Sequence, residues 1–347
     1  MPAMEIGIDS FAILPQDAQP ANQRAAAARM EQLLTEIETA DRAGLDVFGL
    51  GEHHRQEFLD SAPTLILAAA AARTKSIRLT SAVTVLGAAD PVRVFQQFAT
   101  LDLISKGRAE IVVGRGSSIE AFPLFGYSLN DYDDLFTEKL GLLLRVRDAT
   151  HIEWSGRFRP ALTGQGIYPR PLQDKLPIWL GVGGTPQSFV RAGMLGLPLM
   201  LAVIGGRYEQ FRPLVDLYRE AGLRAGHAPE TLRVGLHTVG FVAPTSKEAA
   251  DIFYPGWAQM MSVVGRERGW SLPTRRDFDV MRSDKGTFLI GDPDEVAGNL
   301  MRANHILGGL SRVTFQMSTA SADHEAMTAA ITLLGEKVAT VVRSATA

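Results

Sequence analysis

The fold is decided by a short stretch near the start of the chain, Asp46-Val47-Phe48-Gly49-Leu50-Gly51-Glu52-His53-His54. Its first half, residues 46–50, is a brief apolar run of the kind that forms a buried strand. The run stops at three polar residues, Glu52, His53 and His54. In folds built from parallel strands, ligands bind at the carboxyl ends of the strands. Since an imidazole with an ordinary pKa near ~6.5 can hold or release a proton at working pH, His53 and His54 are the first candidates for chemistry.

Length and composition describe an ordinary globular chain. It has 347 residues, of which 46% are hydrophobic and 21% charged, and its formal net charge is -3. This charge, without a cluster of lysine and arginine, argues against a nucleic-acid partner. The absence of cysteine excludes disulfides, thiolate metal sites and a cysteine nucleophile. No signal peptide is recognisable, and the longest apolar stretch, 62–72, is too short to span a bilayer, so we expect a cytoplasmic protein without membrane contact.

Strand-like and helix-like segments alternate along the whole chain. The expected strands are apolar runs at residues 5–10, 46–50, 77–86, 109–113, 177–182, 198–204, 233–242 and 312–317. The expected helices are amphipathic or alanine-rich and occupy residues 24–43, 63–74, 92–104, 133–147, 186–195, 208–226, 246–261 and 324–343. Continuous apolar runs are typical of parallel strands covered on both faces. This alternation predicts an α/β fold, a (β/α)8 TIM barrel formed by residues 1–347 as a single domain.

Two longer segments interrupt the alternation, one before the fifth strand and one before the eighth. The first, residues 148–176, is rich in glycine and proline and is expected to be irregular. The second, residues 262–311, includes Asp292-Pro293-Asp294-Glu295, whose proline and acidic residues indicate the start of a helix. Loops this long inside a compact domain are usually lids or disordered. We therefore expect residues 266–286 to form a mobile cover over the barrel mouth; the alternative is a surface loop without a role.

Glycine-rich turns follow several of the expected strands. Three Gly-x-Gly elements occur, but none continues into the full fingerprint of a dinucleotide-binding fold, and no Walker A sequence is present. The stretch Gly181-Val182-Gly183-Gly184-Thr185-Pro186-Gln187-Ser188 joins the fifth strand to a helix. Its backbone N–H groups, the helix dipole and the hydroxyls of Thr185 and Ser188 could together bind a phosphate. The alternative is a tight turn in which a hydroxyl caps the helix.

Two further candidates lie on later strands. Arg115, between Gly114 and Gly116, directly follows the fourth strand and suits a bidentate contact with a phosphate or carboxylate; the alternative is a structural ion pair.

We expect no metal site at residues 52–54, because neighbouring strand residues point to opposite faces and only one histidine would face the cavity. His237, inside the seventh strand, is the other histidine that could face the cavity.

Several of these motifs, and others between them, occur in a fixed order along nearly the whole chain. They occupy residues 51–54, 81–83, 90–93, 103–108, 113–116, 177–180, 183–185, 196–198 and 290–295. This collinear set resembles the bacterial luciferase-like monooxygenase family. The resemblance implies a flavin-dependent barrel that uses FMN, usually supplied in reduced form by a separate NAD(P)H:flavin reductase. It also implies reaction with O2 through a C4a-peroxyflavin, and we expect a small, apolar organic substrate and a homodimer.

The resemblance further implies where the flavin would lie. By position, His53 matches the family's histidine beside the isoalloxazine, for which an acid/base role is proposed, and residues 262–290 match the family's mobile loop. Ala82-Val83 matches a non-proline cis peptide under the flavin ring. Tyr132 stands near the place of a phosphate-binding arginine in luciferase. The full set of expected cofactor-binding residues is Ala82, Val83, Thr84, Arg115, Tyr132, Gly183, Gly184, Thr185 and Ser188.

Some features depart from the luciferase pattern. Gly114 stands where luciferase has a reactive cysteine, so light emission and an aldehyde substrate are not supported. The nearest rival function is an F420-dependent oxidoreductase on the same barrel. A non-catalytic flavin-binding protein and a metal-free aldolase- or isomerase-type barrel are two others. The apolar stretch at residues 121–125 is consistent with an apolar substrate entrance.

Overall fold

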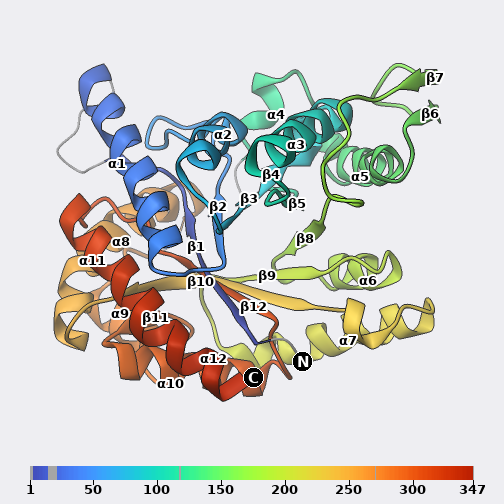
Figure 1. Ribbon diagram of the computed structural model, residues 1–347. Coiled ribbons are helices and arrows are strands. Elements are labelled where there is room, and N and C mark those ends of the chain that lie inside the picture. Colours follow the sequence, from blue (N-terminus) through green and yellow to red (C-terminus); the bar gives the residue numbers. More distant parts are fainter. Residues whose placement is uncertain (1–2, 15–21, 117–118, 270, 347) are drawn as a thin grey trace.

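The centre of the molecule is a parallel sheet that curls into a barrel, seen in the computed structural model that describes residues 3–14, 22–116, 119–269 and 271–346 (Figure 1). The sheet order is β3-β2-β1-β12-β10-β9-β8-β5-β4. Its strands are β1 (Glu5–Ser10), β2 (Val47–Leu50), β3 (Arg78–Ser81), β4 (Thr84–Val85), β5 (Ile111–Gly114), β8 (Ile178–Val182), β9 (Leu199–Val203), β10 (Val234–Val242) and β12 (Arg312–Gln316). β3 and β4 stand at opposite ends of this order yet follow each other in the chain, so the sheet nearly closes on itself.

The predicted TIM barrel is confirmed. Neighbouring barrel strands pair in parallel, and the eight predicted strands correspond to the barrel wall to within a few residues. One difference concerns the strand expected at residues 77–86. It is divided into β3 and β4, and the residues between them, Ala82 and Val83, are joined by a cis peptide bond. This is the isomer that the family resemblance implied.

Helices surround the barrel on its outer side (Figure 1). They are α1 (Gln23–Arg42), α2 (Pro63–Arg73), α3 (Pro91–Ser105), α5 (Tyr132–Asp148), α6 (Pro186–Met194), α7 (Arg212–Arg224), α8 (Ser246–Arg268), α10 (Pro293–Ile306), α11 (His324–Leu333) and α12 (Thr340–Thr346). A π-helical segment, Leu334–Ala339, joins the last two. Apolar faces of helices and strands form one extended core, and every residue of β10 is buried. Burial on both faces explains why the strands are continuous apolar runs.

The two segments outside the regular alternation contain more secondary structure than the sequence suggested. Residues 148–176, expected to be irregular, contain an antiparallel hairpin of β6 (His151–Trp154) and β7 (Leu162–Gly166). Its strands are short and largely exposed, so they contain no apolar run. The helix expected to end at residue 261 continues as α8 to Arg268, and α9 (Arg275–Met281) and β11 (Leu289–Gly291) follow. The helix start at Asp292 is confirmed, since this side chain accepts hydrogen bonds from the backbone of Asp294 and Glu295.

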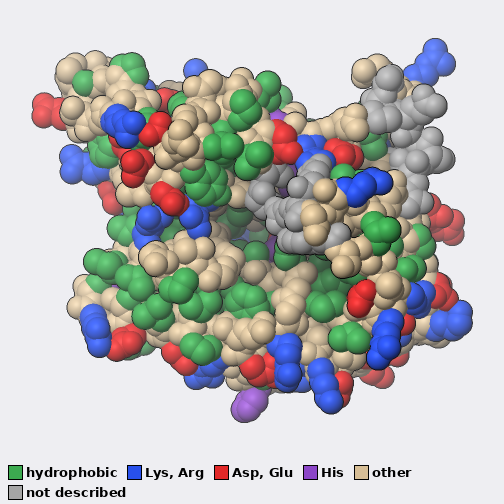
Figure 2. All heavy atoms as spheres, turned by 180° about the vertical axis from the view of Figure 1, so that it is seen from behind, with side chains coloured by type: hydrophobic (Ala, Val, Ile, Leu, Met, Phe, Trp, Pro, Cys, Tyr) green, Lys and Arg blue, Asp and Glu red, His purple; other side chains and the backbone are tan. Residues whose placement is uncertain are grey.

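The two ends of the chain meet at the amino-terminal end of the barrel. The backbone N–H of Met4 donates a 3.2 Å hydrogen bond to Oγ1 of Thr346, and N and C lie close together in Figure 1. On the face seen in Figure 2, acidic and basic side chains are scattered among apolar ones without a region of one sign. No helix within the described residues is both long and apolar enough to cross a membrane.

Candidate active site

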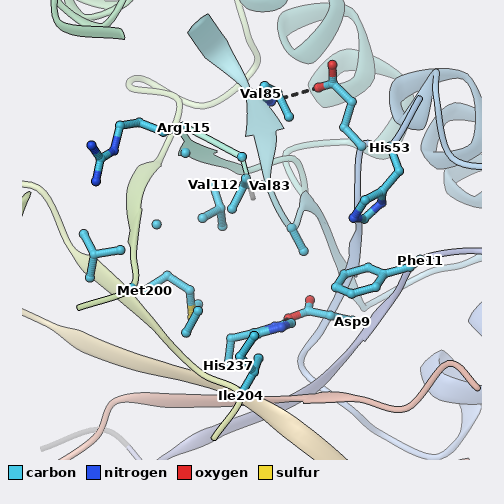
Figure 3. A pocket seen from close by; sticks show the side chains of 18 of the residues that line it. Asp9, Phe11, His53, Val83, Val85, Val112, Arg115, Met200, Ile204 and His237 are labelled. Carbon is cyan, nitrogen blue, oxygen red and sulfur yellow. Dashed lines mark hydrogen bonds and ion pairs between the residues drawn. The ribbon is translucent and has the colours of Figure 1, made fainter. Parts of the chain in front are cut away.

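A cavity of about 420 Å³ opens at the carboxyl ends of the barrel strands, where ligands bind in folds of this type. This volume is within the usual range for small-molecule sites. Val83 and Val112 lie on one wall, and polar side chains gather around them at three places, near His53, Arg115 and His237 (Figure 3). The cavity therefore combines an apolar wall with a few separated polar groups.

His53 is held in place by a buried carboxylate. Its Nδ1 lies 2.9 Å from Oδ2 of Asp60, and its backbone N–H donates to the other carboxylate oxygen over 3.1 Å. Burial raises the pKa of Asp60, and the hydrogen bond and charge of His53 act in the opposite direction. The imidazole stacks on the ring of Phe58 and is tilted against that of Phe11, at centroid distances of 4.4 and 4.7 Å. With Nδ1 occupied, Nε2 is the atom of His53 that can exchange a proton with a ligand.

The expectation that only one of the two adjacent histidines faces the cavity is wrong. Both His53 and His54 line it. The expectation assumed strand geometry, but β2 ends at Leu50, so the alternation of faces does not apply to residues 53 and 54. His54 Nε2 lies 3.2 Å from Oε1 of Glu52, whose other oxygen accepts from the backbone N–H of Val85 over 2.9 Å. Glu52 thereby ties the end of β2 to β4.

Arg115 joins two hydroxyl groups at the start of helix α6. Its Nη2 donates to Oγ1 of Thr185 over 3.2 Å and to Oγ of Ser188 over 3.4 Å, and all three residues line the cavity. Its Nη1 donates to Asp133 on α5 over 2.7 Å. The predicted phosphate-binding groups are thus brought together, and the ion pair considered as an alternative is present as well.

The alternative interpretation of the turn before α6, a hydroxyl that caps the helix, is wrong. Thr185 occupies the N-cap position, but its side chain makes no capping hydrogen bond and instead accepts from Arg115. A Cβ added to Gly183 would meet nothing within 4 Å, so the backbone here is open to a ligand. The first N–H groups of an α-helix lack intrahelical partners and favour an anion. The turn therefore has the features of an anion site.

The remaining predicted cofactor residues are divided between the cavity and its surroundings. Ala82, Val83 and Tyr132 line the cavity, and the hydroxyl of Tyr132 donates to the carbonyl of Gly116 over 2.9 Å. Burial raises the pKa of Tyr132, so this hydroxyl stays protonated and can remain a donor. Thr84 and Gly184 are not part of the lining. They fall beside lining residues in the sequence, which is why position alone included them.

A second carboxylate holds His237 from β10, which lines the cavity as predicted. Its Nδ1 lies 2.6 Å from Oδ2 of Asp9 on β1, and the hydroxyl of Thr314 on β12 donates to the same oxygen. All three side chains are buried. Asp9 was not predicted from the sequence. Its position inside an otherwise apolar strand could have indicated a site residue, since a buried carboxylate needs a polar partner.

The two glycines of Gly49-Leu50-Gly51 leave space for these carboxylates. A Cβ on Gly49 would lie 2.1 Å from Oδ1 of Asp9, and one on Gly51 would lie 2.7 Å from Oδ2 of Asp60. Both distances are far below van der Waals contact. The stretch that ends in His53 and His54 thus also makes room for the groups that orient His53 and His237.

Known proteins resemble this chain in sequence. A sequence profile described as luciferase-like monooxygenase matches residues 9–309. The protein y4vJ of Sinorhizobium fredii is 25% identical over 342 residues, which cover 94% of this chain and 96% of that protein. The 3,6-diketocamphane 1,6-monooxygenase of Pseudomonas putida is 24% identical over 317 residues, covering 78% of this chain and 82% of the relative.

Solved structures show the same fold. The monooxygenase RslO1 from Streptomyces bottropensis superposes with a TM-score of 0.84 at 24% identity, covering 97% of this chain and 99% of the other. The oxygenating constituent of 3,6-diketocamphane monooxygenase from Pseudomonas putida, solved with FMN, gives 0.76 at 21% identity, covering 97% and 98%. An F420-dependent secondary alcohol dehydrogenase gives 0.74 at 19% identity, covering 98% and 99%. Because the family profile matches residues 9–309, which is most of the chain, the chain belongs to the luciferase-like monooxygenase family.

Proposed function

We propose that this protein is a flavin-dependent monooxygenase, which uses reduced FMN and O2 to oxidise a small, apolar organic substrate. The observation that carries the proposal is the convergence of Arg115, Thr185 and Ser188 at the start of α6, next to an apolar wall in the same cavity. A flavin mononucleotide needs both features, an anion site for its phosphate and a flat apolar surface for its ring. A phosphate held here would position the ring through binding energy remote from the reaction.

The wall beside this anion site suits a flat ring. Glycines at positions 114 and 181 let Val83 come close to β5 and β8, since a Cβ on either would lie 2.7 or 2.9 Å from its methyl groups. Val83 and Val112 then present an apolar surface. Bound there, reduced FMN would supply the electrons with which O2 gives one oxygen atom to the substrate and the other to water. The apolar lining keeps solvent away from that reaction.

His53 is the residue we assign to proton transfer near the flavin. Its Nδ1 is bound by Asp60, and Phe11 and Phe58 fix the plane of the ring, so Nε2 has a defined position at the cavity. A positioned histidine with a pKa near the operating pH is an efficient general acid or base. In this proposal a separate NAD(P)H:flavin reductase supplies reduced FMN, and the active protein is a homodimer.

An F420-dependent oxidoreductase is the second candidate, because a protein with that cofactor shares the fold. Binding measurements distinguish the two. The full-length protein is titrated separately with FMN, riboflavin, F420 and, without oxygen, reduced FMN. We expect FMN species to bind more tightly than F420, and FMN more tightly than riboflavin, which lacks the phosphate.

The variant Arg115→Ala tests the anion site. We expect it to weaken FMN binding about tenfold or more, because a charge-assisted contact to phosphate is lost, and to leave riboflavin binding nearly unchanged. Arg224→Ala is the matched control, since Arg224 is exposed on α7 and pairs with Glu220. Tighter binding of F420 than of reduced FMN, or an unchanged FMN affinity in Arg115→Ala, would contradict the proposal.

A further inference from the structure

The His237–Asp9 pair has no part in the function proposed above, although it lies in the same cavity. In Figure 3, Asp9 and His237 lie together on the side of the pocket away from Arg115. The ring of Phe11 lies between this pair and His53. Its centroid is 4.7 Å from that of His53 and 6.1 Å from that of His237. Two histidines, each oriented by a buried carboxylate, therefore face one cavity from two sides.

The hydrogen bonds of Asp9 determine which tautomer His237 adopts. A carboxylate only accepts hydrogen bonds, so the proton between Asp9 and His237 resides on Nδ1 of the imidazole. In the neutral ring, Nε2 is then an acceptor. Among the described residues, the structure contains no hydrogen bond to this atom, and Asp9 is the only hydrogen-bond partner of the ring. Nε2 of His237 is thus an acceptor in a cavity wall, and it suits a ligand that donates.

The residues around His237 indicate the polarity of the ligand. In the sheet, His237 stands between Ala202 on β9 and Thr314 on β12, and the hydroxyl of Thr314 is already used by Asp9. Met200 and Phe11 add apolar surface to the same part of the cavity. Arg312, which precedes Thr314 on β12 and also lines the cavity, is fully buried and paired with Glu110 and Glu5. Asp9 is therefore the only charged side chain of the described residues that is hydrogen-bonded to His237.

We propose that His237 and Asp9 bind the hydroxyl of a phenol-type substrate, and that Nε2 of His237 takes its proton. The inference rests on the proposed function and specifies its substrate class. The O–H bond breaks, the proton forms an N–H bond at Nε2, and the electron pair stays on the substrate oxygen. The imidazolium so formed remains paired with the Asp9 carboxylate. No oxidant is needed for this step. It makes the ring carbons ortho and para to the oxygen electron-rich, as oxygen insertion there requires.

A pair of matched probes tests the proposal. Para-nitrophenol carries the required hydroxyl, and para-nitroanisole has a methyl ether in its place. Binding of each to the FMN-loaded, full-length protein is measured by calorimetry. We expect the phenol to bind about tenfold more tightly than the ether, the difference made by one hydrogen bond in a desolvated site. At a pH where free para-nitrophenol is largely protonated, difference spectra should show the phenolate form when it is bound.

Two variants test whether the preference for the phenol depends on His237 and Asp9. His237→Phe keeps an aromatic ring beside Phe11 but has no acceptor, so it should bind both probes with similar affinity and produce no phenolate. Asp9→Asn removes the charge that keeps Nδ1 protonated, and should reduce the preference for the phenol and the phenolate signal. His305→Phe is the matched control, because His305 is exposed on α10.

FMN affinity, measured in the same samples, separates this inference from the proposed function. If FMN binds but the wild-type protein does not prefer the phenol, or His237→Phe retains the preference and the phenolate signal, the inference is wrong and the flavin assignment stands. If the protein binds no FMN species, the proposed function fails, whatever the probes do.

Discussion

Two glycines in one short stretch leave room for the carboxylates that hold His53 and His237, two of the three histidines of the described residues that line the cavity. Gly49 leaves room for Asp9 and Gly51 leaves room for Asp60, and each carboxylate is hydrogen-bonded to Nδ1 of its histidine. Partners of this kind fix the orientation and tautomer of an imidazole, and their loss commonly reduces activity. A side chain at either glycine would therefore displace a carboxylate that orients one of these histidines.

His53 can be tested without knowledge of the substrate. In His53→Asn, we expect the reoxidation of bound reduced FMN by O2, followed by visible absorbance in a stopped-flow instrument, to slow about 10²-fold or more, because a positioned proton donor or acceptor is lost. FMN affinity should be retained, since Arg115 and the α6 turn are untouched. His227→Asn, at a residue bonded to the carbonyl of Met194 outside the cavity, is the control. An unchanged rate in His53→Asn would reject the proton-transfer role.

Individual site residues could be predicted where they directly follow a strand. His53 and Arg115 were found because apolar runs end just before them, and parallel strands end at the same side of a barrel. Asp60, Phe58 and Glu52 were not identified as partners, because their contacts depend on the conformation of the loop after β2. No periodicity of the sequence specifies that conformation.

At the scale of elements, the long segment before β12 differs most from expectation. Residues 266–286 were expected to form a mobile cover, yet much of this segment is helical, and none of its described residues lines the cavity. Helix α9 is held by Phe278, which is fully buried and contacts the rings of Tyr254, Trp257 and Phe288 at centroid distances of 5.4, 5.3 and 6.1 Å. A role as a cover stays a prediction.

Phe278 should determine whether α9 remains folded. We expect Phe278→Ala to destabilise this region by about 3 kcal/mol or more, since a large side chain is removed from a closed cluster. Trypsin should then cut faster at Arg275, Arg276 and Arg282, as mass spectrometry of early fragments would detect. Val280→Ala on the same helix is the control, because Val280 is more than half exposed, at 57%. Equal rates of cleavage in the two variants would contradict the packing argument.

The elements themselves were predictable where burial imposes a pattern. Strands such as β8 and β10 are largely buried, so their sequences are mostly apolar, and His237 and Thr238 are the polar exceptions in β10. The β6–β7 hairpin lies largely outside the core, and α9 has only one fully buried residue, Phe278, so neither has a strong pattern. The cis peptide bond in the third barrel strand was implied only by the family resemblance, and the division of this strand was not expected, because a cis peptide bond does not alter hydrophobic periodicity.

At the scale of the whole molecule, Arg312 joins distant parts of the barrel. It is fully buried, lies 2.6 Å from Oε2 of Glu110, and donates through Nε to Glu5 over 2.7 Å. Its guanidinium also lies over the ring of Trp179, 4.4 Å from the centroid. A buried pair of this kind adds little net stability when it is intact, but loss of one partner leaves an uncompensated charge in the core.

Arg312→Met should therefore destabilise the fold by about 3–5 kcal/mol at neutral pH. Urea unfolding followed by tryptophan fluorescence would measure it. In Glu110→Leu/Arg312→Met, which removes both charges, most of the loss should be recovered. A double variant as unstable as the single one would show that shape, not charge, is the cause.

The same pair predicts how stability depends on pH. Burial raises the pKa of Glu110, but the charge and hydrogen bonds of Arg312 lower it by more. The pKa of Glu110 in the folded protein is therefore below the ordinary value of 4.5. As pH falls, Glu110 is therefore protonated in the unfolded chain before it is protonated in the folded protein. The stability that ionised Glu110 contributes is present above pH 4.5 and is lost as pH falls through its pKa in the folded protein. In Arg312→Met the main group that lowers this pKa is gone, and the destabilisation relative to the wild-type protein comes from the buried charge of Glu110. Urea unfolding at several pH values should therefore show that this destabilisation becomes smaller as pH falls and Glu110 takes up its proton.

The contact between Met4 and Thr346 has a practical consequence. Both residues lie at the amino-terminal end of the barrel, and the cavity opens at the opposite end. A linker attached beyond residue 346 would therefore let the enzyme be fixed to a bead or an electrode with its entrance facing the solution.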